Sequence, residues 1–231
     1  MFPLTILANL LYPPACLLCH TLLPVPGSVP DSSRSEVSGT AVLCAECARD
    51  RPRAPVPAGQ AAAGEAARAP WRYTHRAAQA VQQFKYHRRW RIGRWLAEEM
   101  ADTARTWLPL HDIDAIVPVP QHWLKCWLRG FDPVAQLAHD VSRSLRRPCL
   151  PRALRRTRWT VSQTTLQTRA RRRNVRNAFA AAPKAVQGRA ILLVDDVLTS
   201  GATAHACAEA LRQAGASRVF VLTAARTFSN E

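Results

Sequence analysis

The alternation of apolar and polar positions along the chain predicts strands and helices that follow one another. Short apolar runs have the length and composition of buried strands, and they cover residues 114–119, 190–194 and 219–222. Apolar side chains recur at helical spacing in residues 77–86, 90–107 and 132–145, and again after Thr203. Strands that alternate with helices favour an α/β fold with a doubly wound, mostly parallel sheet and helices on both faces.

The first part of the chain has a different composition. Residues 51–70 are rich in Ala, Pro and Gly, which is typical of a linker. We therefore divide the chain into residues 1–66, a small module with its linker, and residues 67–231, the α/β domain. Residues 3–11 are expected to form a short apolar helix that covers part of the core.

The apolar N-terminus superficially resembles a secretory signal. However, Pro13 and Pro14 interrupt it, and the first Arg is Arg34, so a basic leading region is missing. No apolar stretch reaches the roughly 18 residues that a membrane span needs. We expect no membrane span and a cytoplasmic location.

Residues 190–214 hold the most informative pattern. The apolar run ends in two adjacent carboxylates, Asp195 and Asp196, and a Thr-Ser-Gly-Ala-Thr loop at 199–203 precedes the next helix. Such a loop points backbone N–H groups at one place, where the helix dipole favours a phosphate. The two acids suit sugar hydroxyls or a divalent cation. A plain turn with a Ser or Thr helix cap is the alternative, but it does not explain the acid pair, the loop and the second threonine together.

The positive charge of the chain is concentrated in one block. The formal net charge is +16, and residues 141–194 contain thirteen Arg, one Lys and no acid, so that this block alone carries +14. A local positive field attracts phosphates, either on a small metabolite or on nucleic acid. The block precedes the candidate phosphate loop, and composition leaves both kinds of ligand open.

Four cysteines form two CxxC pairs, Cys16 with Cys19 and Cys44 with Cys47. Two such pairs can close tetrahedrally around zinc, because each short turn aims both sulfurs at one point. A disulfide framework is the weaker alternative, since the other cysteines are scattered and the enzyme-like core suggests a reducing compartment. A thioredoxin-type redox motif would need a preceding strand, and none is evident. His20 could substitute as a ligand, but four cysteines already complete a zinc-ribbon-like site.

The sequence VDDVLTSGAT at 194–203 resembles the phosphoribosyl diphosphate (PRPP) signature of type I phosphoribosyltransferases. That resemblance implies that the acid pair binds the ribose 2′- and 3′-hydroxyls and that the loop binds the 5′-phosphate. It also implies Mg²⁺ bound together with PRPP. With the turn at 117–120, which the resemblance places near the diphosphate, the expected PRPP-binding residues are Pro118, Val119, Pro120, Asp195, Asp196, Thr199, Ser200, Gly201, Ala202 and Thr203.

A closer resemblance covers nearly the whole chain. The four-cysteine module, FKYHRRWRIGRWLA, IVPVP, RGFDPVAQLA, QTTLQTRARRRNVRNAF and LLVDDVLTSGAT occur in the order found in the ComF family, phosphoribosyltransferase-like proteins linked to bacterial competence. The family pattern places Arg129-Gly130-Phe131 close to the same site. It departs from this chain at Asp132-Pro133, where Asn-Gln is usual. The candidates for a hood over the ligand, or for nucleic-acid contacts, are Gln163, Arg169, Arg171, Arg172, Arg173 and Asn174.

Two functions remain open from the sequence. The first is a phosphoribosyltransferase that uses PRPP and Mg²⁺, with Asp195, Asp196 and Arg129 as the candidate catalytic residues and with an unidentified acceptor. The second is a non-catalytic protein that senses PRPP or a nucleotide and binds single-stranded DNA through the basic block. The ComF resemblance implies a role in DNA uptake and natural transformation, with a competence helicase or a recombination mediator as partner.

Overall fold

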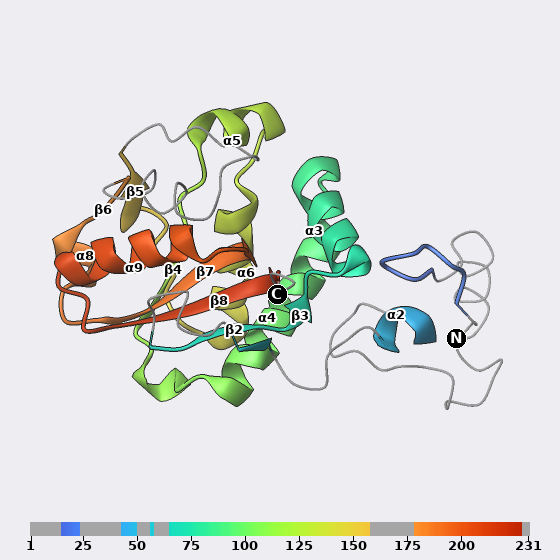
Figure 1. Ribbon diagram of the computed structural model, residues 1–231, viewed down its shortest axis with the longest axis horizontal. Helices are drawn as coiled ribbons and strands as arrows, with labels where there is room; N and C mark the ends of the chain where they lie inside the picture. Colours follow the sequence, from blue (N-terminus) through green and yellow to red (C-terminus); the bar gives the residue numbers. More distant parts are fainter. Residues whose placement is uncertain (1–14, 24–42, 50–55, 58–64, 158–177, 228–231) are drawn as a thin grey trace, which may run out of the picture.

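A computed structural model describes residues 15–23, 43–49, 56–57, 65–157 and 178–227. A twisted sheet runs through the centre of this part (Figure 1). Its strands are parallel, except that the outermost pair is antiparallel. Along the sheet the order is β1 (Val56–Pro57), β2 (Ala67–Ala69), β8 (Arg218–Arg226), β7 (Ala190–Leu198) and β4 (Ala115–Pro118), while β3 (Trp71–Arg72) pairs with the last residues of β8.

Helices cover both faces of this sheet, as Figure 1 shows. The first face carries α3 (His75–His87), α4 (Trp90–Trp107) and α6 (Pro133–Leu145). The second face carries α9 (Ala202–Gln213), α8 (Pro183–Val186) and a two-stranded sheet of β5 (Leu154–Arg156) and β6 (Phe179–Ala181). The predicted doubly wound, mostly parallel α/β sheet is therefore confirmed.

Strand β7 is buried on both sides, which explains its continuous apolar sequence. Successive side chains of a strand point to opposite faces. Leu192 and Val194 pack with α4 and α6, whereas Ile191 and Leu193 pack with α9. The same strand therefore contacts both apolar layers, and it holds the acid pair near its carboxyl end.

Capping residues fix the connection between β4 and α6. Helix α5 (Trp123–Arg129) starts where the His122 ring nitrogen accepts a hydrogen bond from Leu124 N, and it ends at Gly130, whose φ of +73° favours glycine. The Asp132 carboxylate accepts hydrogen bonds from the N–H groups of Val134 and Ala135 and so caps α6. Asp132 thus has a structural role as the N-cap of α6.

Most sequence-predicted elements are confirmed with small changes at their ends. The predicted helix 90–107 matches α4, the helix 77–86 is extended to His75–His87, and the helix 132–145 begins one residue later. The pattern missed the short strands β1, β2, β3, β5 and β6 and the short helices α2 (Ala45–Arg49), η3 (Leu110–Asp112), α5 and α8. The expected helix at 3–11 lies outside the described residues.

Two expectations were wrong at particular places. The strand predicted to end at Val194 continues to Leu198, because Asp195, Val197 and Leu198 keep pairing with β8. Part of the predicted linker 51–70 is ordered in the sheet, since β2 pairs in parallel with β8. The alanines at 67 and 69 have small side chains and are buried there. The small side chains of this segment, which we interpreted as a sign of a linker, instead allow β2 to pack closely in the sheet.

Within the part of the chain that the structure describes, no helix has both the length and the apolar character that crossing a bilayer requires.

Candidate functional site

The acid pair lies near the carboxyl end of β7 in the centre of the sheet. Asp195 and Asp196 are 7 % and 6 % exposed, so both carboxylates are largely removed from water. The backbone N–H of Asp196 donates a 2.9 Å hydrogen bond to Asp195 Oδ1. In open parallel sheets, ligands bind beyond the carboxyl ends of the strands. The predicted clamp therefore lies where such folds hold their ligands.

Burial and a neighbouring negative charge raise the pKa of Asp195 to about 8. Loss of hydration is the larger cause, and the charge of Asp196 is the second. Near neutral pH this carboxyl group is therefore largely protonated. A protonated Asp195 can both donate and accept hydrogen bonds, whereas an ionised carboxylate only accepts them.

A lysine from α3 neutralises the other acid. Lys85 Nζ lies 2.6 Å from Asp196 Oδ2, with both side chains largely buried. The site residues expected from the sequence do not include Lys85. The available signal was its helical spacing with Val81 and Phe84 on the buried side of α3.

The loop after the acids has the geometry of an anion site. Gly201 adopts φ +73° as the N-cap of α9, and no side chain among the described residues caps this helix. The first-turn N–H groups of a helix lack intrahelical partners and favour an anion. Positive φ at Gly201 explains the glycine in the Thr-Ser-Gly-Ala-Thr loop. No acid lies in the first turn of α9 to oppose a phosphate.

The turn after β4 lies beside the acids, as the sequence suggested. Pro118 is in register with Val194, and the Val119 N–H donates a 2.8 Å hydrogen bond to the Val194 carbonyl. The turn at Val119 and Pro120 therefore begins next to Asp195. The structure brings the predicted turn, acid pair and loop to the same edge of the sheet.

Arg129 makes its contacts with α3 rather than with the acids. Its guanidinium lies 4.8 Å from the Tyr86 ring centroid, and its Nη2 donates a 3.2 Å hydrogen bond to the Tyr86 hydroxyl. Its carbonyl accepts two hydrogen bonds from Arg88. These contacts of Arg129 connect α5 to α3, and none of them reaches Asp195 or Asp196.

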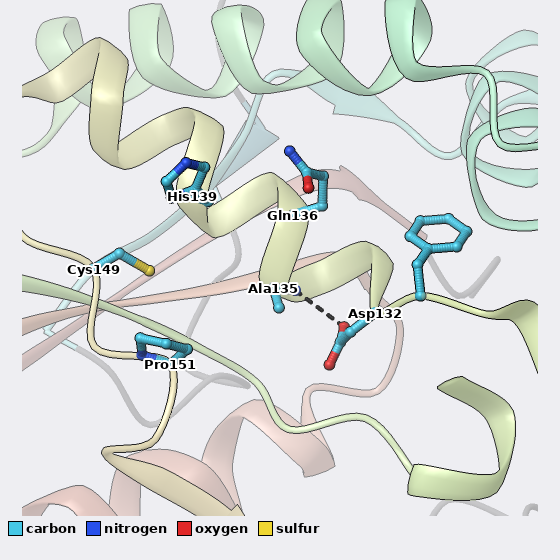
Figure 2. A pocket seen from close by; sticks show the side chains of 7 residues that line it. Asp132, Ala135, Gln136, His139, Cys149 and Pro151 are labelled. Atoms are coloured by element: carbon cyan, nitrogen blue, oxygen red, sulfur yellow. Dashed lines mark hydrogen bonds between the residues drawn. The ribbon is translucent and has the colours of Figure 1, made fainter. Parts of the chain in front are cut away.

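A cavity of about 410 Å³ opens at the start of α6 (Figure 2). Asp132 lies at this cavity, and its charge also contributes to raising the pKa of Asp195. Burial, followed by the Asp132 charge, raises the pKa of the nearby Cys126 thiol to about 11. The walls are formed by Phe131, Asp132, Ala135, Gln136, His139, Cys149 and Pro151.

A second cavity, of about 550 Å³, is basic and lies next to exposed aromatic residues. It starts at the Pro120 turn and includes three arginines of the β5 region, Arg152, Arg155 and Arg156. Trp123 lines this cavity and is 67 % exposed. Neither of these two cavities is lined by the acid pair.

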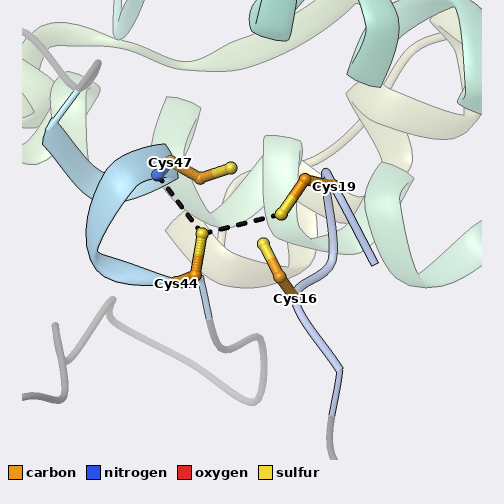
Figure 3. Close-up of side chains that lie close together, drawn as sticks. All are labelled: Cys16, Cys19, Cys44 and Cys47. Carbon is orange, nitrogen blue, oxygen red and sulfur yellow. Dashed lines mark hydrogen bonds between the residues drawn. The ribbon is translucent and has the colours of Figure 1, made fainter. Parts of the chain in front are cut away.

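The four cysteines of the N-terminal module come together, as predicted. Figure 3 shows the sulfurs of Cys16, Cys19, Cys44 and Cys47 facing one another, and all four lie within 4.8 Å of each other. The Cys19 and Cys44 sulfurs are 3.6 Å apart. Tetrahedral Zn–S bonds of about 2.3 Å place sulfurs a little under 4 Å apart. All four cysteines are free, so the cluster could hold a metal ion and is consistent with structural zinc.

This cysteine module packs against α3 and α4. Leu18 and Leu43 are fully buried in the same apolar cluster as Trp95. Arg76 of α3 lies 3.5 Å from Glu46, and Arg89, which precedes α4, contacts the His20 ring at 3.2 Å. His20 thus makes an intramolecular contact and is not part of the sulfur cluster. The module therefore contacts α3, the helix that carries Lys85.

The hood candidates lie outside the described residues. They are Gln163, Arg169, Arg171, Arg172, Arg173 and Asn174.

Comparisons with known proteins identify relatives by sequence. No protein-family model matches the chain. The chain is 32 % identical over 151 residues to competence protein F of Haemophilus influenzae, which covers 63 % of this chain and 66 % of that protein. It is 38 % identical over 151 residues to DNA utilization protein YhgH of Escherichia coli K12, covering 64 % and 66 %. It is 36 % identical over 160 residues to the Salmonella typhi protein of that name, covering 67 % and 69 %.

Solved structures give weaker likenesses. One is the allosteric regulatory enzyme of purine biosynthesis, with a TM-score of 0.42 and 22 % identity over 62 % of this chain and 30 % of that one. Another is glutamine PRPP amidotransferase from B. subtilis with ADP and GMP, with a TM-score of 0.41 and 18 % identity over 61 % and 30 %. Likenesses at this level place no ligand in the present chain.

The sequence relatives decide the family. The first of them are matched over 66 % of their length, and the Salmonella typhi protein over 69 %. The ComF assignment made from the motifs is confirmed, and the chain belongs to the family of competence protein F and DNA utilization protein YhgH.

Proposed function

We propose that the carboxyl edge of β7 and β4 binds a ribose that carries a 5′-phosphate, with PRPP and Mg²⁺ as the full ligand. The observation that carries the proposal is the juxtaposition of a buried acid pair with an uncapped helix N-terminus behind Gly201. Carboxyl groups accept hydrogen bonds from sugar hydroxyls, and the start of α9 favours a phosphate. The two halves match the two ends of a phosphorylated ribose.

Each group then has a distinct role in the proposed complex. Asp195 and Asp196 hold the 2′- and 3′-hydroxyls, and Thr199 to Thr203 surround the 5′-phosphate with hydroxyl and N–H donors. The turn at Val119 and Pro120 lies beside the acids and is suited to contact the diphosphate. Mg²⁺, when bound, would offset the diphosphate charge.

Group transfer is the reaction that such a ligand supports. An acceptor nucleophile would form a bond to C1 of the ribose while the C1–oxygen bond breaks, and diphosphate would leave with the electron pair. The acceptor's proton would pass to solvent. Positioning and charge neutralisation supply most of what this chemistry needs. Asp195 and Asp196 are the candidate catalytic residues at this site, whereas Arg129, the third candidate from the sequence, makes its contacts with α3.

Calorimetry with ribose 5-phosphate and with PRPP tests this proposal. We expect ribose 5-phosphate to bind without a metal, and PRPP to bind more tightly when Mg²⁺ is present. Ribose and inorganic phosphate should each bind much more weakly, because each uses only half of the site. Failure of both phosphorylated sugars to bind, with or without Mg²⁺, would contradict the proposal.

A second function, binding of single-stranded DNA, is favoured by the basic cavity next to α5. Trp123 and Trp127 are 67 % and 72 % exposed, and Trp123 lines the cavity together with Arg152 and Arg155. Exposed aromatic rings beside arginines suit stacked bases and a phosphate backbone.

The relatives are named for competence and DNA utilization. We therefore propose that this chain acts in DNA uptake and transformation, with a competence helicase or a recombination mediator as partner.

The strand-binding proposal predicts a specific response to salt. Replacing Arg152 and Arg155 by Gln should reduce the slope of log affinity against log salt by about 1.4, at roughly 0.7 per phosphate contact. Replacing Trp123 and Trp127 by Ala should lower the affinity for a single-stranded oligonucleotide about tenfold or more, through lost stacking. Fluorescence anisotropy of a labelled oligonucleotide measures both effects.

The matched control for this experiment is Arg105→Gln, on the far end of α4, where Arg105 bonds Asp102 and the Ser144 carbonyl. It should leave the affinity and the slope unchanged. DNA affinity that is insensitive to all four substitutions would contradict the assignment of this surface. If replacing Asp195 and Asp196 lowered the oligonucleotide affinity as much as these substitutions do, the DNA would instead bind at the ribose phosphate site.

A further inference from the structure

Lys85 occupies the proposed ribose phosphate site, although neither the sequence patterns nor the family resemblance assigned it a role. Its ammonium group lies 2.6 Å from Asp196 Oδ2, and its side chain is 19 % exposed. A hydroxyl that bonds to Asp196 Oδ2 would therefore lie close to the ammonium. An ammonium group has three N–H donors, so a lysine bound to one carboxylate oxygen can still donate to a ligand oxygen.

The residues on either side of Lys85 are held by the turn that ends α5. Arg129 stacks on Tyr86 and accepts hydrogen bonds at its carbonyl from Arg88 Nη2 and Nε, at 2.7 and 3.1 Å. Phe131 packs edge-on against Phe84, with ring centroids 5.8 Å apart. The turn therefore contacts α3 at Phe84, immediately before Lys85, and at Tyr86, immediately after it.

The backbone conformation favours glycine in the middle of this turn, since the φ of Gly130 is +73°, which other residues rarely adopt. A Cβ atom there would also displace the Arg88 guanidinium from its place beside the Arg129 carbonyl. Trp90 completes the cluster, since its ring lies 4.9 Å from that of Phe131 and 6.4 Å from that of Phe84. The three residues from Arg129 to Phe131 each contribute a different contact to one surface of α3.

We propose that Lys85 is a ligand-contacting residue of the ribose phosphate site and that Arg129, Gly130 and Phe131 are positioning residues that act through it. This proposal rests on the proposed function of that site. It assigns Arg129 a role at a distance, in place of the direct catalytic role that the sequence suggested. In the bound state the Lys85 ammonium bridges Asp196 and an oxygen of the phosphorylated sugar.

Selective labelling of amines tests the positioning without any ligand. The chain has three lysines, Lys85, Lys125 and Lys184, and the last two are exposed and serve as internal standards. With an acetylating reagent and mass spectrometry, Lys85 should react about tenfold more slowly than the other two, since an ion pair in a largely buried place opens rarely. Arg129→Met and Gly130→Ala should each bring the Lys85 rate toward that of Lys125.

The control for labelling is Arg105→Met, which removes an arginine that joins α4 to the end of α6 in a similar way. It should not change the Lys85 rate. If Lys85 reacts as fast as Lys125 in the unsubstituted protein, or if Arg129→Met and Gly130→Ala leave its rate unchanged, the positioning role is overturned. Circular dichroism on each variant confirms that the fold persists, and Arg129→Met keeps the test open if Gly130→Ala does not fold.

A double-mutant cycle tests whether the turn acts through Lys85. Lys85→Met and Arg129→Met should each weaken ribose 5-phosphate binding, by about tenfold and about fivefold, tenfold being 1.4 kcal/mol. In the Lys85→Met background, Arg129→Met should then have less than about a twofold further effect. Independent, multiplying effects would overturn the coupling, because a generally damaged fold gives that result.

The two proposals fail in different ways in this experiment. If the unsubstituted protein does not bind ribose 5-phosphate, the proposed function falls and this inference falls with it. If the unsubstituted protein binds and Lys85→Met binds equally well, the ribose phosphate site stands and the role of Lys85 is overturned.

Discussion

Replacing Asp195 and Asp196 together by Asn is expected to abolish measurable binding of ribose 5-phosphate and of PRPP. Asn has nearly the shape of Asp but lacks the charge, so the Lys85 ammonium would lose its partner and the sugar hydroxyls would lose their strongest acceptors. A hydrogen bond to the charged Asp196 contributes about 1.5–3 kcal/mol and one to the largely protonated Asp195 about 1 kcal/mol, so losing both weakens binding by about fiftyfold or more. Calorimetry measures this loss directly.

The same substitutions separate loss of function from loss of stability. Burial raises the pKa of Asp195 to about 8, well above the value of an unfolded Asp. A group whose pKa is raised by folding stabilises the protein below its unfolded pKa, and this stability is lost as the pH rises toward 8. Asp195→Asn removes that titration. Its melting temperature should therefore exceed that of the unsubstituted protein above about pH 8, although binding is lost.

Asp140→Asn is the matched control for the acid pair. Asp140 lies on α6, where it accepts a hydrogen bond from Gln136, and it is not part of the site. Ligand binding should be unchanged in this variant. If the Asp195 and Asp196 variant is folded and still binds ribose 5-phosphate with unchanged affinity, the acids do not hold the sugar.

The elements that could be predicted from the sequence are those in which the polarity of each residue follows whether it faces the core or water. Helix α4 could be predicted to the residue, because one stripe of it is buried against the sheet and the other faces water. Strand β7 is longer than predicted, because the prediction ended the strand where its apolar run meets the first charged residue, Asp195. Asp195 remains in the sheet because its backbone pairs with β8 and its carboxyl group can take up a proton.

The candidate site was predicted where chemistry is local and missed where it depends on tertiary structure. The acid pair, the Gly201 loop and the Val119 turn each carry a motif within a few residues. Lys85 carries no motif, because its role depends on the contact between α3 and the end of β7. Helix α5 was missed for a related reason, since its exposed tryptophans show neither helical nor strand burial periodicity.

Removing metal from the cysteine module is expected to have the second largest effect. We propose that the module binds one zinc ion per chain through Cys16, Cys19, Cys44 and Cys47. Because four metal–sulfur bonds would join two segments that lie far apart in the sequence, the metal should supply much of the module's stability. A strong chelator should lower the melting temperature by roughly 10 °C, at about 2–4 °C per kcal/mol for a chain of this size.

The effect should extend to the ribose phosphate site through α3. Arg76 and Arg89 hold the module at each end of that helix, and Leu18 and Leu43 belong to its apolar cluster. If the module loosens, Lys85 should label faster with the acetylating reagent, and ribose 5-phosphate affinity should fall about twofold to fivefold, a change of under about 1 kcal/mol. Cys44→Ser should reproduce both changes without a chelator.

Cys149→Ser is the control, because Cys149 lies at the α6 cavity and away from the sulfur cluster. It should keep the full zinc content and the Lys85 labelling rate. Elemental analysis showing about one zinc per chain in the unsubstituted protein and none in Cys44→Ser is the expected result. A protein that purifies without zinc and with two disulfides among these four cysteines would contradict the metal site. Faster labelling of Lys85 on chelation, without unfolding of the sheet, would show that α3 transmits the state of the module to the acid pair.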